Sequence, residues 1–169
     1  IIIFAGDNGL AVGQHGLMGK QNVYEHSVGV PLMIKAAAQH TGKKTADLCY
    51  LIDVFPTLCD MLQLPVPQSV DGISLLSSLD GKEPVRDYLY YSYMDNQRGI
   101  SDGTWKLIEY HVNGKRTTQL FNLKNDPWER NDLSGQKKYE KTIQRLREKM
   151  AEEQKRTNDT SVFWNNFSY

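Results

Sequence analysis

Polar residues suited to binding a cation and an oxyanion gather near the start of the chain, each close to a glycine. Asp7 and Asn8 pair a carboxylate with an amide carbonyl, and both are hard oxygen ligands of the kind that Ca²⁺ and Mg²⁺ prefer. His15 and Lys20 follow in the same glycine-rich stretch. A lysine ammonium is a compact point cation that suits sulfate or phosphate. These residue types would suit a site where a divalent cation and an anionic group meet.

The same residues also have an ordinary structural interpretation. Asp7-Asn8-Gly9 is a good turn sequence, because Asn and Gly both tolerate a positive φ. A lysine beside a glycine is usually a solvated surface residue, and a histidine in a loop is usually structural. Residue types alone therefore leave a turn and a binding site both open.

The polar block begins where a strand is expected to end. Residues 1–5 form a short apolar, β-branched run, which predicts a strand buried on both faces. In open α/β sheets, ligands bind at the carboxyl edge of such strands. The glycine-rich loop over about 6–29 lets the backbone approach a ligand closely, and a second strand is expected over about 30–36.

The rest of the chain divides into a helical part and a strand-rich part, predicted as domains 1–85 and 86–169. Apolar spacing predicts a helix over 47–62, kinked or restarted at Pro56. Asp102-Gly103 and Asn113-Gly114 are strong hairpin signals. The remaining expected elements are a helical turn at 75–79, strands at 88–93, 99–101, 105–110 and 119–123 in a small antiparallel sheet, and an amphipathic helix at 136–156.

Composition narrows the class of protein. The 169 residues are 40% hydrophobic and 24% charged, as in soluble globular proteins. The net charge is zero, so there is no electrostatic case for binding nucleic acid or a membrane surface. No apolar run approaches the roughly 20 residues of a membrane-spanning helix.

Residues 4–32, FAGDNGLAVGQHGLMGKQNVYEHSVGVPL, closely resemble the second half of the catalytic domain of type I sulfatases. These are formylglycine-dependent enzymes of the alkaline phosphatase superfamily. The similarity continues, in order, through residues 51–75, 98–108 and 120–133. The resemblance implies an α/β fold: the C-terminal part of an alkaline-phosphatase-like sulfatase domain, plus a small antiparallel sheet with a packed C-terminal helix.

The resemblance also implies roles for individual residues. Asp7 and Asn8 match the pair that binds the active-site divalent cation, usually calcium. Lys20 matches the catalytic lysine that contacts the sulfate and helps the leaving oxygen depart. His15 is a candidate substrate-binding residue that contacts the leaving sugar or acts as its general acid, with a structural loop histidine as the alternative. Glu25 is expected to be a structural anchor of the loop.

The implied function is hydrolysis of sulfate esters. The glycine-rich loop resembles that of sulfatases acting on sulfated carbohydrates, so these are the expected substrates. The family's nucleophile lies in a Cys/Ser-x-Pro/Ala-x-Arg motif, and neither Cys49 nor Cys59 fits it. The formylglycine and the remaining metal ligands are therefore expected in a preceding part of a longer, periplasmic or secreted chain, and this chain alone is expected to be inactive. Arg98 is expected to form a structural ion pair rather than to face a substrate. A phosphodiesterase or phosphonate monoester hydrolase of the same superfamily, and an inactive fragment, are the alternatives.

Overall fold

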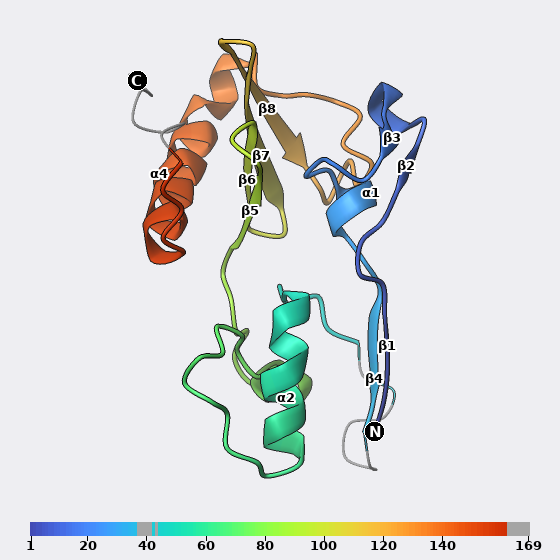
Figure 1. Cartoon of the computed structure of the whole chain (residues 1–169). Helices are drawn as coiled ribbons and strands as arrows, with labels where there is room; N and C mark the ends of the chain where they lie inside the picture. The colour runs from blue at the N-terminus through green and yellow to red at the C-terminus, as the bar shows by residue number, and fades with distance from the viewer. Residues whose placement is uncertain (37–41, 43, 162–169) are drawn as a thin grey trace. The chain divides into compact units, whose positions relative to one another are not determined.

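The computed structural model describes residues 1–36, 42 and 44–161, and these residues form two compact units (Figure 1). The first unit comprises Ile1–Asp7 and Val30–Leu89. The second comprises Asn8–Gly29 and the described residues from Tyr90 onward. The glycine-rich loop thus belongs with the C-terminal half of the chain, and the domain division at residue 85 stays a prediction.

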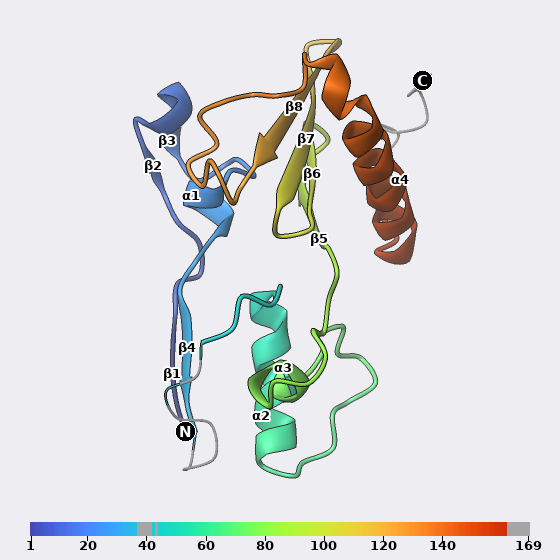
Figure 2. The same cartoon turned by 180° about the vertical axis from the view of Figure 1, so that it is seen from behind.

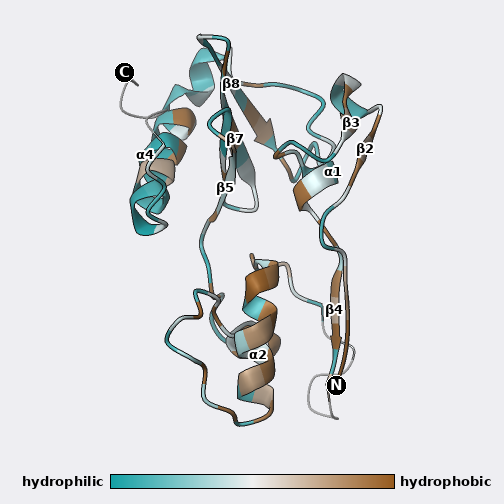
Figure 3. Cartoon of the chain, in the orientation of Figure 1, coloured by the Kyte–Doolittle hydropathy of each residue, from teal (hydrophilic) through white to brown (hydrophobic). Residues whose placement is uncertain are grey.

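The first unit begins with a two-stranded antiparallel ribbon, β1 (Ile2–Ala5) and β4 (Leu32–Lys35) (Figure 2). Both strands were predicted, but burial of β1 on both faces is wrong for the described structure. Ile2 is 65% exposed and Phe4 is 57% exposed. The reason is that β4 is the sole strand partner of β1 in the part of the chain that the structure describes. Hydrophobic residues are prominent along β4 and along the helix α2 (Val54–Met61) in Figure 3.

The helices of the first unit are η3 (Leu51–Asp53), α2 (Val54–Met61) and α3 (Leu76–Leu79). Pro56 lies in the first turn of α2. Backbone N–H groups in a first turn make no intrahelical hydrogen bond, so a proline there costs the helix none. The helix predicted over 47–62 begins later than expected, at Leu51 as η3, and it becomes an α-helix at Val54, two residues before Pro56.

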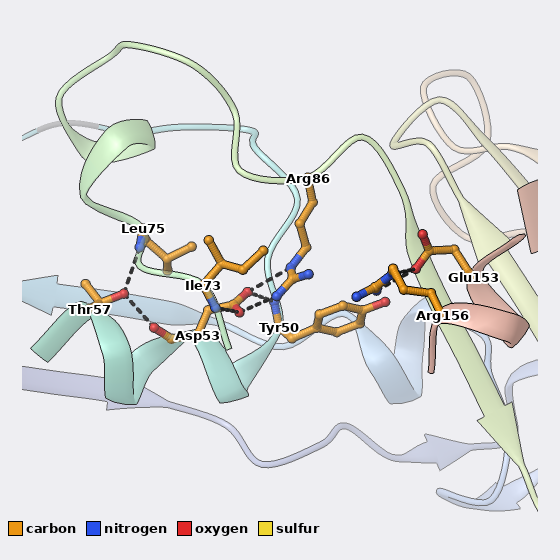
Figure 4. Close-up of polar contacts among 8 residues, drawn as sticks. All are labelled: Tyr50, Asp53, Thr57, Ile73, Leu75, Arg86, Glu153 and Arg156. Carbon is orange, nitrogen blue, oxygen red and sulfur yellow. Dashed lines mark hydrogen bonds and ion pairs between the residues drawn. The ribbon is translucent and has the colours of Figure 1, made fainter. Parts of the chain in front are cut away.

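A buried carboxylate holds this helical segment together (Figure 4). Asp53 is fully buried and accepts backbone N–H groups from Tyr50 and Ile73, both at 2.8 Å. The guanidinium of Arg86 donates to the same carboxylate, with Nε 3.1 Å from Oδ2, and its side chain is only 6% exposed. Arg86 also lies over the Tyr50 ring, with its Cζ 4.7 Å from the ring centroid.

We predict that Asp53→Asn destabilises the first unit by about 3–5 kcal/mol, because it leaves the buried guanidinium without its counter-charge. Thermal and urea unfolding of the variant in the full protein measure this loss. The matched control is Asp80→Asn, because Asp80 pairs with Lys82, whose side chain is 71% exposed. That control should cost less than about 1 kcal/mol. Equal losses in the two variants would contradict the prediction.

The second unit contains the four-stranded sheet, in the order β5-β6-β7-β8. The strand bounds are Leu89–Tyr93, Gln97–Ser101, Trp105–Val112 and Lys115–Asn122. The turn between β7 and β8 has φ values of 52° at Asn113 and 74° at Gly114. Two successive residues in the left-handed region are what a tight hairpin requires, so the hairpin signal there is confirmed.

The C-terminal helix covers this sheet. It runs as η4 (Lys137–Tyr139) and then α4 (Glu140–Arg156), and it packs on β6 and β7 (Figure 1). Its buried residues are Ile143, Leu146 and Met150, as the amphipathic spacing predicted. No helix among the described residues is both long and apolar enough to cross a membrane.

The glycine-rich loop folds against the sheet through short elements that were not predicted. These are β2 (Ala11–Val12), η1 (Gln14–Gly16), β3 (Met18–Gly19) and α1 (Glu25–Val28). Between β3 and α1, Val23 and Tyr24 are buried in a core with Ile108 and Phe121 of the sheet. The loop is therefore anchored by its second half.

Candidate functional site

Asp7 and Asn8 follow the end of β1 after one residue, Gly6, in the loop where they were predicted, and both are exposed. The backbone just beyond them is fixed, because the Gly9 N–H donates to the Ser27 carbonyl at 2.9 Å. A Cβ at Gly9 would lie 2.0 Å from the carbonyl oxygen of His26, so only glycine fits. This close approach sets where the chain turns after Asp7 and Asn8.

The donor set of this pair fits a hard divalent cation, because it offers one carboxylate and one amide oxygen on consecutive residues. Residues 1–36, 42 and 44–161 contain no group of three or more His, Cys, Asp or Glu side chains placed to hold a metal ion. The two residues therefore offer part of a coordination shell.

A small hairpin carries the other two predicted site residues. β2 pairs with β3, and η1 forms its connection, closed by the Gly13 N–H donating to the Leu17 carbonyl at 2.9 Å. His15 lies in η1 with a φ of 53° and is exposed. Lys20 follows β3 directly and is also exposed, and its carbonyl accepts the Asn22 N–H at 2.9 Å.

His15 is held by a stack of rings. Its imidazole lies parallel to the Tyr24 ring, with centroids 4.0 Å apart and planes 5° apart. His26 stacks beside both, with its ring centroid 5.6 Å from that of His15 and 5.7 Å from that of Tyr24. The Tyr24 hydroxyl donates to Gln119 Oε1 of β8 at 2.6 Å, which ties the stack to the sheet. Burial, followed by the nearby charges of His15 and Lys106, lowers the pKa of His26.

A buried charge cluster lies beneath the loop. Lys106 of β7 is fully buried, and its Nζ lies 2.8 Å from Glu25 Oε1 and 3.1 Å from Glu129 Oε1. Glu129 Oε2 in turn accepts the Glu25 backbone N–H at 2.6 Å. Burial raises the pKa of Glu129, and the Lys106 ammonium opposes that rise. The expected role of Glu25 as a structural anchor is confirmed by these contacts.

Arg98 also has the structural role expected of it. Its Nε donates to Asp159 Oδ2 at 2.7 Å, and its side chain is only 3% exposed. Burial alone would raise the pKa of Asp159, but hydrogen bonds from Tyr90 and Arg98 hold it below its usual value. Arg98 therefore joins the sheet to the segment after α4.

We predict that Lys106→Met destabilises the second unit by about 3–5 kcal/mol, because two carboxylates lose their shared cation. The loss should grow as pH rises. A carboxyl whose folded pKa lies above its unfolded value binds its proton more tightly when folded, so stability falls as pH rises from the unfolded pKa through the folded one. Unfolding midpoints between about pH 5 and pH 8 measure this trend. The control is Lys115→Met, which removes an exposed ammonium at the end of the β7–β8 hairpin. A loss of stability in Lys106→Met that does not change with pH would contradict the prediction.

A surface pocket of about 850 Å³ lies wholly within the second unit. It brings His15 together with His26 and with a segment far along the chain. Its lining residues are Gln14, His15, Glu25, His26, Gly29, Pro127, Trp128, Glu129 and Arg130. Asp7, Asn8 and Lys20 are not among them. The sequence placed residues 127–129 in a family signature, but it did not predict that they line a pocket. The one signal that could have pointed to the pocket is a tryptophan in a turn sequence, where a large apolar side chain is unusual.

Comparisons with known proteins bear on the family of the chain. The sequence model of the family described as "N-sulphoglucosamine sulphohydrolase, C-terminal" matches residues 13–156. The chain belongs to this family. The predicted membership in the C-terminal part of the sulfatases of the alkaline phosphatase superfamily is thereby confirmed, and so is the predicted fold class, since solved sulfatase structures share it.

Relatives of this sulfatase C-terminal chain are named sulfatases. An N-acetylglucosamine-6-O-sulfatase of Bacteroides thetaiotaomicron is 30% identical over an alignment of 172 positions. The alignment covers 94% of this chain and 31% of that protein. Human arylsulfatase K is 26% identical, over 75% of this chain and 26% of that protein. The chain thus spans about a third or less of the length of these relatives.

Solved structures extend the similarity. BT4656, determined in complex with its substrate D-glucosamine-2-N,6-O-disulfate, has a TM-score of 0.77 and 27% identity over 96% of this chain and 35% of its own. A phosphonate monoester hydrolase of Agrobacterium radiobacter has a TM-score of 0.73 and 25% identity over 89% of this chain and 34% of its own. A protein named as a 2-O GAG sulfatase and one named as a phosphonate monoester hydrolase therefore both contain a region with this fold.

Proposed function

We propose that this chain is the C-terminal part of a sulfatase that hydrolyses sulfate esters of carbohydrates. The observation that carries the proposal is the match, over 96% of this chain, to a structure holding a disulfated glucosamine substrate. The named sulfatase relatives add support. A periplasmic or secreted location stays a prediction.

Four residues of this chain have roles in the proposal. Asp7 and Asn8 would hold the divalent cation, expected to be calcium, through their side-chain oxygens, and that cation polarises sulfate oxygens when bound. Lys20 offsets the negative charge that grows on the bridging oxygen as the ester bond breaks. His15, oriented by its stack on Tyr24, contacts the leaving sugar. The nucleophile is expected to be a formylglycine outside this chain.

The proposed partner of the first unit is the rest of the sulfatase chain. Ile2, Phe4 and Phe55 are each more than half exposed, at 65%, 57% and 52%. Ile2 and Phe4 lie two residues apart on β1, and Phe4 pairs with Met33, which is 60% exposed. Contiguous exposed apolar surface of this kind commonly marks an interaction surface. We propose that the preceding part of the catalytic domain covers them.

The alternative reaction is hydrolysis of a phosphonate monoester, which the Agrobacterium radiobacter neighbour favours. The family match and the named relatives favour the sulfate ester. The test is the full-length protein assayed with a sulfated glucosamine, by release of inorganic sulfate, and with a phosphonate monoester. We expect kcat/KM to favour the sulfate ester by about a hundredfold or more. The opposite preference, or no turnover of either ester by folded protein, would overturn the proposal.

A further inference from the structure

The pocket in the second unit carries a tryptophan that breaking a sulfate ester does not require. Trp128 is 67% exposed and lines the same pocket as His15 and His26. Leaving a large indole surface in water forgoes the free energy of burying it. An exposed aromatic ring at the wall of a pocket is typical of a surface that a ligand covers.

The neighbours of Trp128 fix where its backbone lies. The next residue, Glu129, is buried with a φ of 54° and accepts the Glu25 N–H at 2.6 Å. On the other side, Asp126 accepts the Asn131 N–H at 2.8 Å through its carboxylate and the Glu129 N–H at 3.1 Å through its carbonyl. A loop closed at both ends in this way fixes the backbone that carries Trp128, so little backbone freedom remains to be lost on binding.

The pocket lining offers one exposed cation to an anionic ligand. Glu25 and Glu129 share the single buried Lys106 ammonium, which balances one of their two negative charges within the protein. Arg130 lies exposed in the same lining. Its planar guanidinium matches the oxygens of a sulfate group and can bind two of them at once.

The face of an indole ring suits a sugar. Its π-electrons make the face negative, so the C–H groups of a pyranose ring, which carry partial positive charge, are attracted to it. At about 850 Å³, the pocket lies within the range of small-molecule sites.

We propose that Trp128 and Arg130 form a binding subsite for a sulfated sugar ring, in which the ring stacks on Trp128 and Arg130 binds its sulfate group. This inference rests on the proposed function, which supplies the class of ligand. It adds two specificity-determining residues from a segment far in sequence from the glycine-rich loop.

The test measures binding rather than turnover. The full-length protein with Lys20→Ala is titrated with D-glucosamine-2-N,6-O-disulfate and, separately, with unsulfated glucosamine, by calorimetry. Adding Trp128→Ala should raise the Kd for the disulfate by about fivefold to tenfold, while Trp128→Phe keeps most of the affinity. Adding Arg130→Gln should weaken the disulfate about tenfold and leave glucosamine unchanged. Val112→Ala and Lys115→Gln, two exposed changes on the β7–β8 hairpin, are the controls.

The outcomes separate this inference from the proposed function. Unchanged Kd values in both Trp128→Ala and Arg130→Gln would overturn the subsite, even if the wild-type enzyme releases sulfate. Loss of affinity in both variants supports the subsite, even if the wild-type enzyme releases no sulfate from the same sugar, in which case the proposed function is what fails.

Discussion

Replacing Asp7 with alanine in the full-length enzyme is expected to remove the bound divalent cation and the activity together. The variant deletes a carboxylate from a coordination shell to which this chain offers one carboxylate and one amide oxygen. A metal ion that polarises the sulfate is worth several kcal/mol in the transition state, so kcat/KM should fall by about a thousandfold or more. Metal analysis of the purified protein and steady-state kinetics measure the two effects.

Two companion variants sharpen this test. Asp60→Ala removes an exposed carboxylate on α2 of the same unit, and should leave the metal content and kcat/KM unchanged. Asp7→Asn keeps an oxygen ligand without its charge, so it should bind the cation more weakly and retain part of the activity. Full activity with a stoichiometric cation in Asp7→Ala would exclude the assignment of this residue.

Replacing Lys20 with alanine is expected to lower kcat by about a hundredfold to a thousandfold, as for the loss of one charge-stabilising donor. The fall should depend on the leaving group. A sugar alkoxide leaves poorly and needs the ammonium, whereas a nitrophenolate carries its own charge easily. The loss should therefore be largest for a sugar sulfate and smallest for nitrophenyl sulfate. Both substrates are assayed with the same enzyme preparations.

The fold should not suffer from this change, because Lys20 is exposed after the short strand β3. Exposed substitutions usually change the free energy of unfolding by less than about 0.5 kcal/mol. Lys115→Ala at the β7–β8 hairpin is the matched control for removing an exposed ammonium. Equal losses with both esters would mean that Lys20 binds the sulfate group rather than the leaving oxygen, and unchanged kinetics would remove it from the site.

The parts of the fold that local sequence determines were predicted. Asn113-Gly114 favours a tight turn through its own backbone preferences, and strands formed on both sides of it. The apolar stripe of Ile143, Leu146 and Met150 likewise predicted which face of α4 is buried. Both signals lie within a few residues of the element they describe.

The features that were missed depend on residues far apart in the chain. The cluster of Glu25, Lys106 and Glu129 joins three segments, and no local pattern marks a lysine in a strand as buried. The pocket combines the loop around His15 with the segment around Trp128 for the same reason. The burial expected for β1 failed because burial depends on what packs against a strand, whereas the apolar run reports only its own composition.

Sequence similarity to the sulfatases assigned the cation-binding role to Asp7 and Asn8 and the sulfate-binding role to Lys20. The chemistry of these side chains suits those roles. The structure adds how the loop is held: by Gly9 against the His26 carbonyl and by Tyr24 in the core. The three assignments stay predictions until the variants are measured.

The most direct test of the central claim, that this chain completes a formylglycine sulfatase, is mass analysis of the natural gene product with peptide mapping and aldehyde labelling. The account predicts a longer protein, with a formylglycine in a segment that precedes the strand ending at Ala5. A natural product that begins near Ile1, or a longer one whose peptides contain no aldehyde, would contradict it.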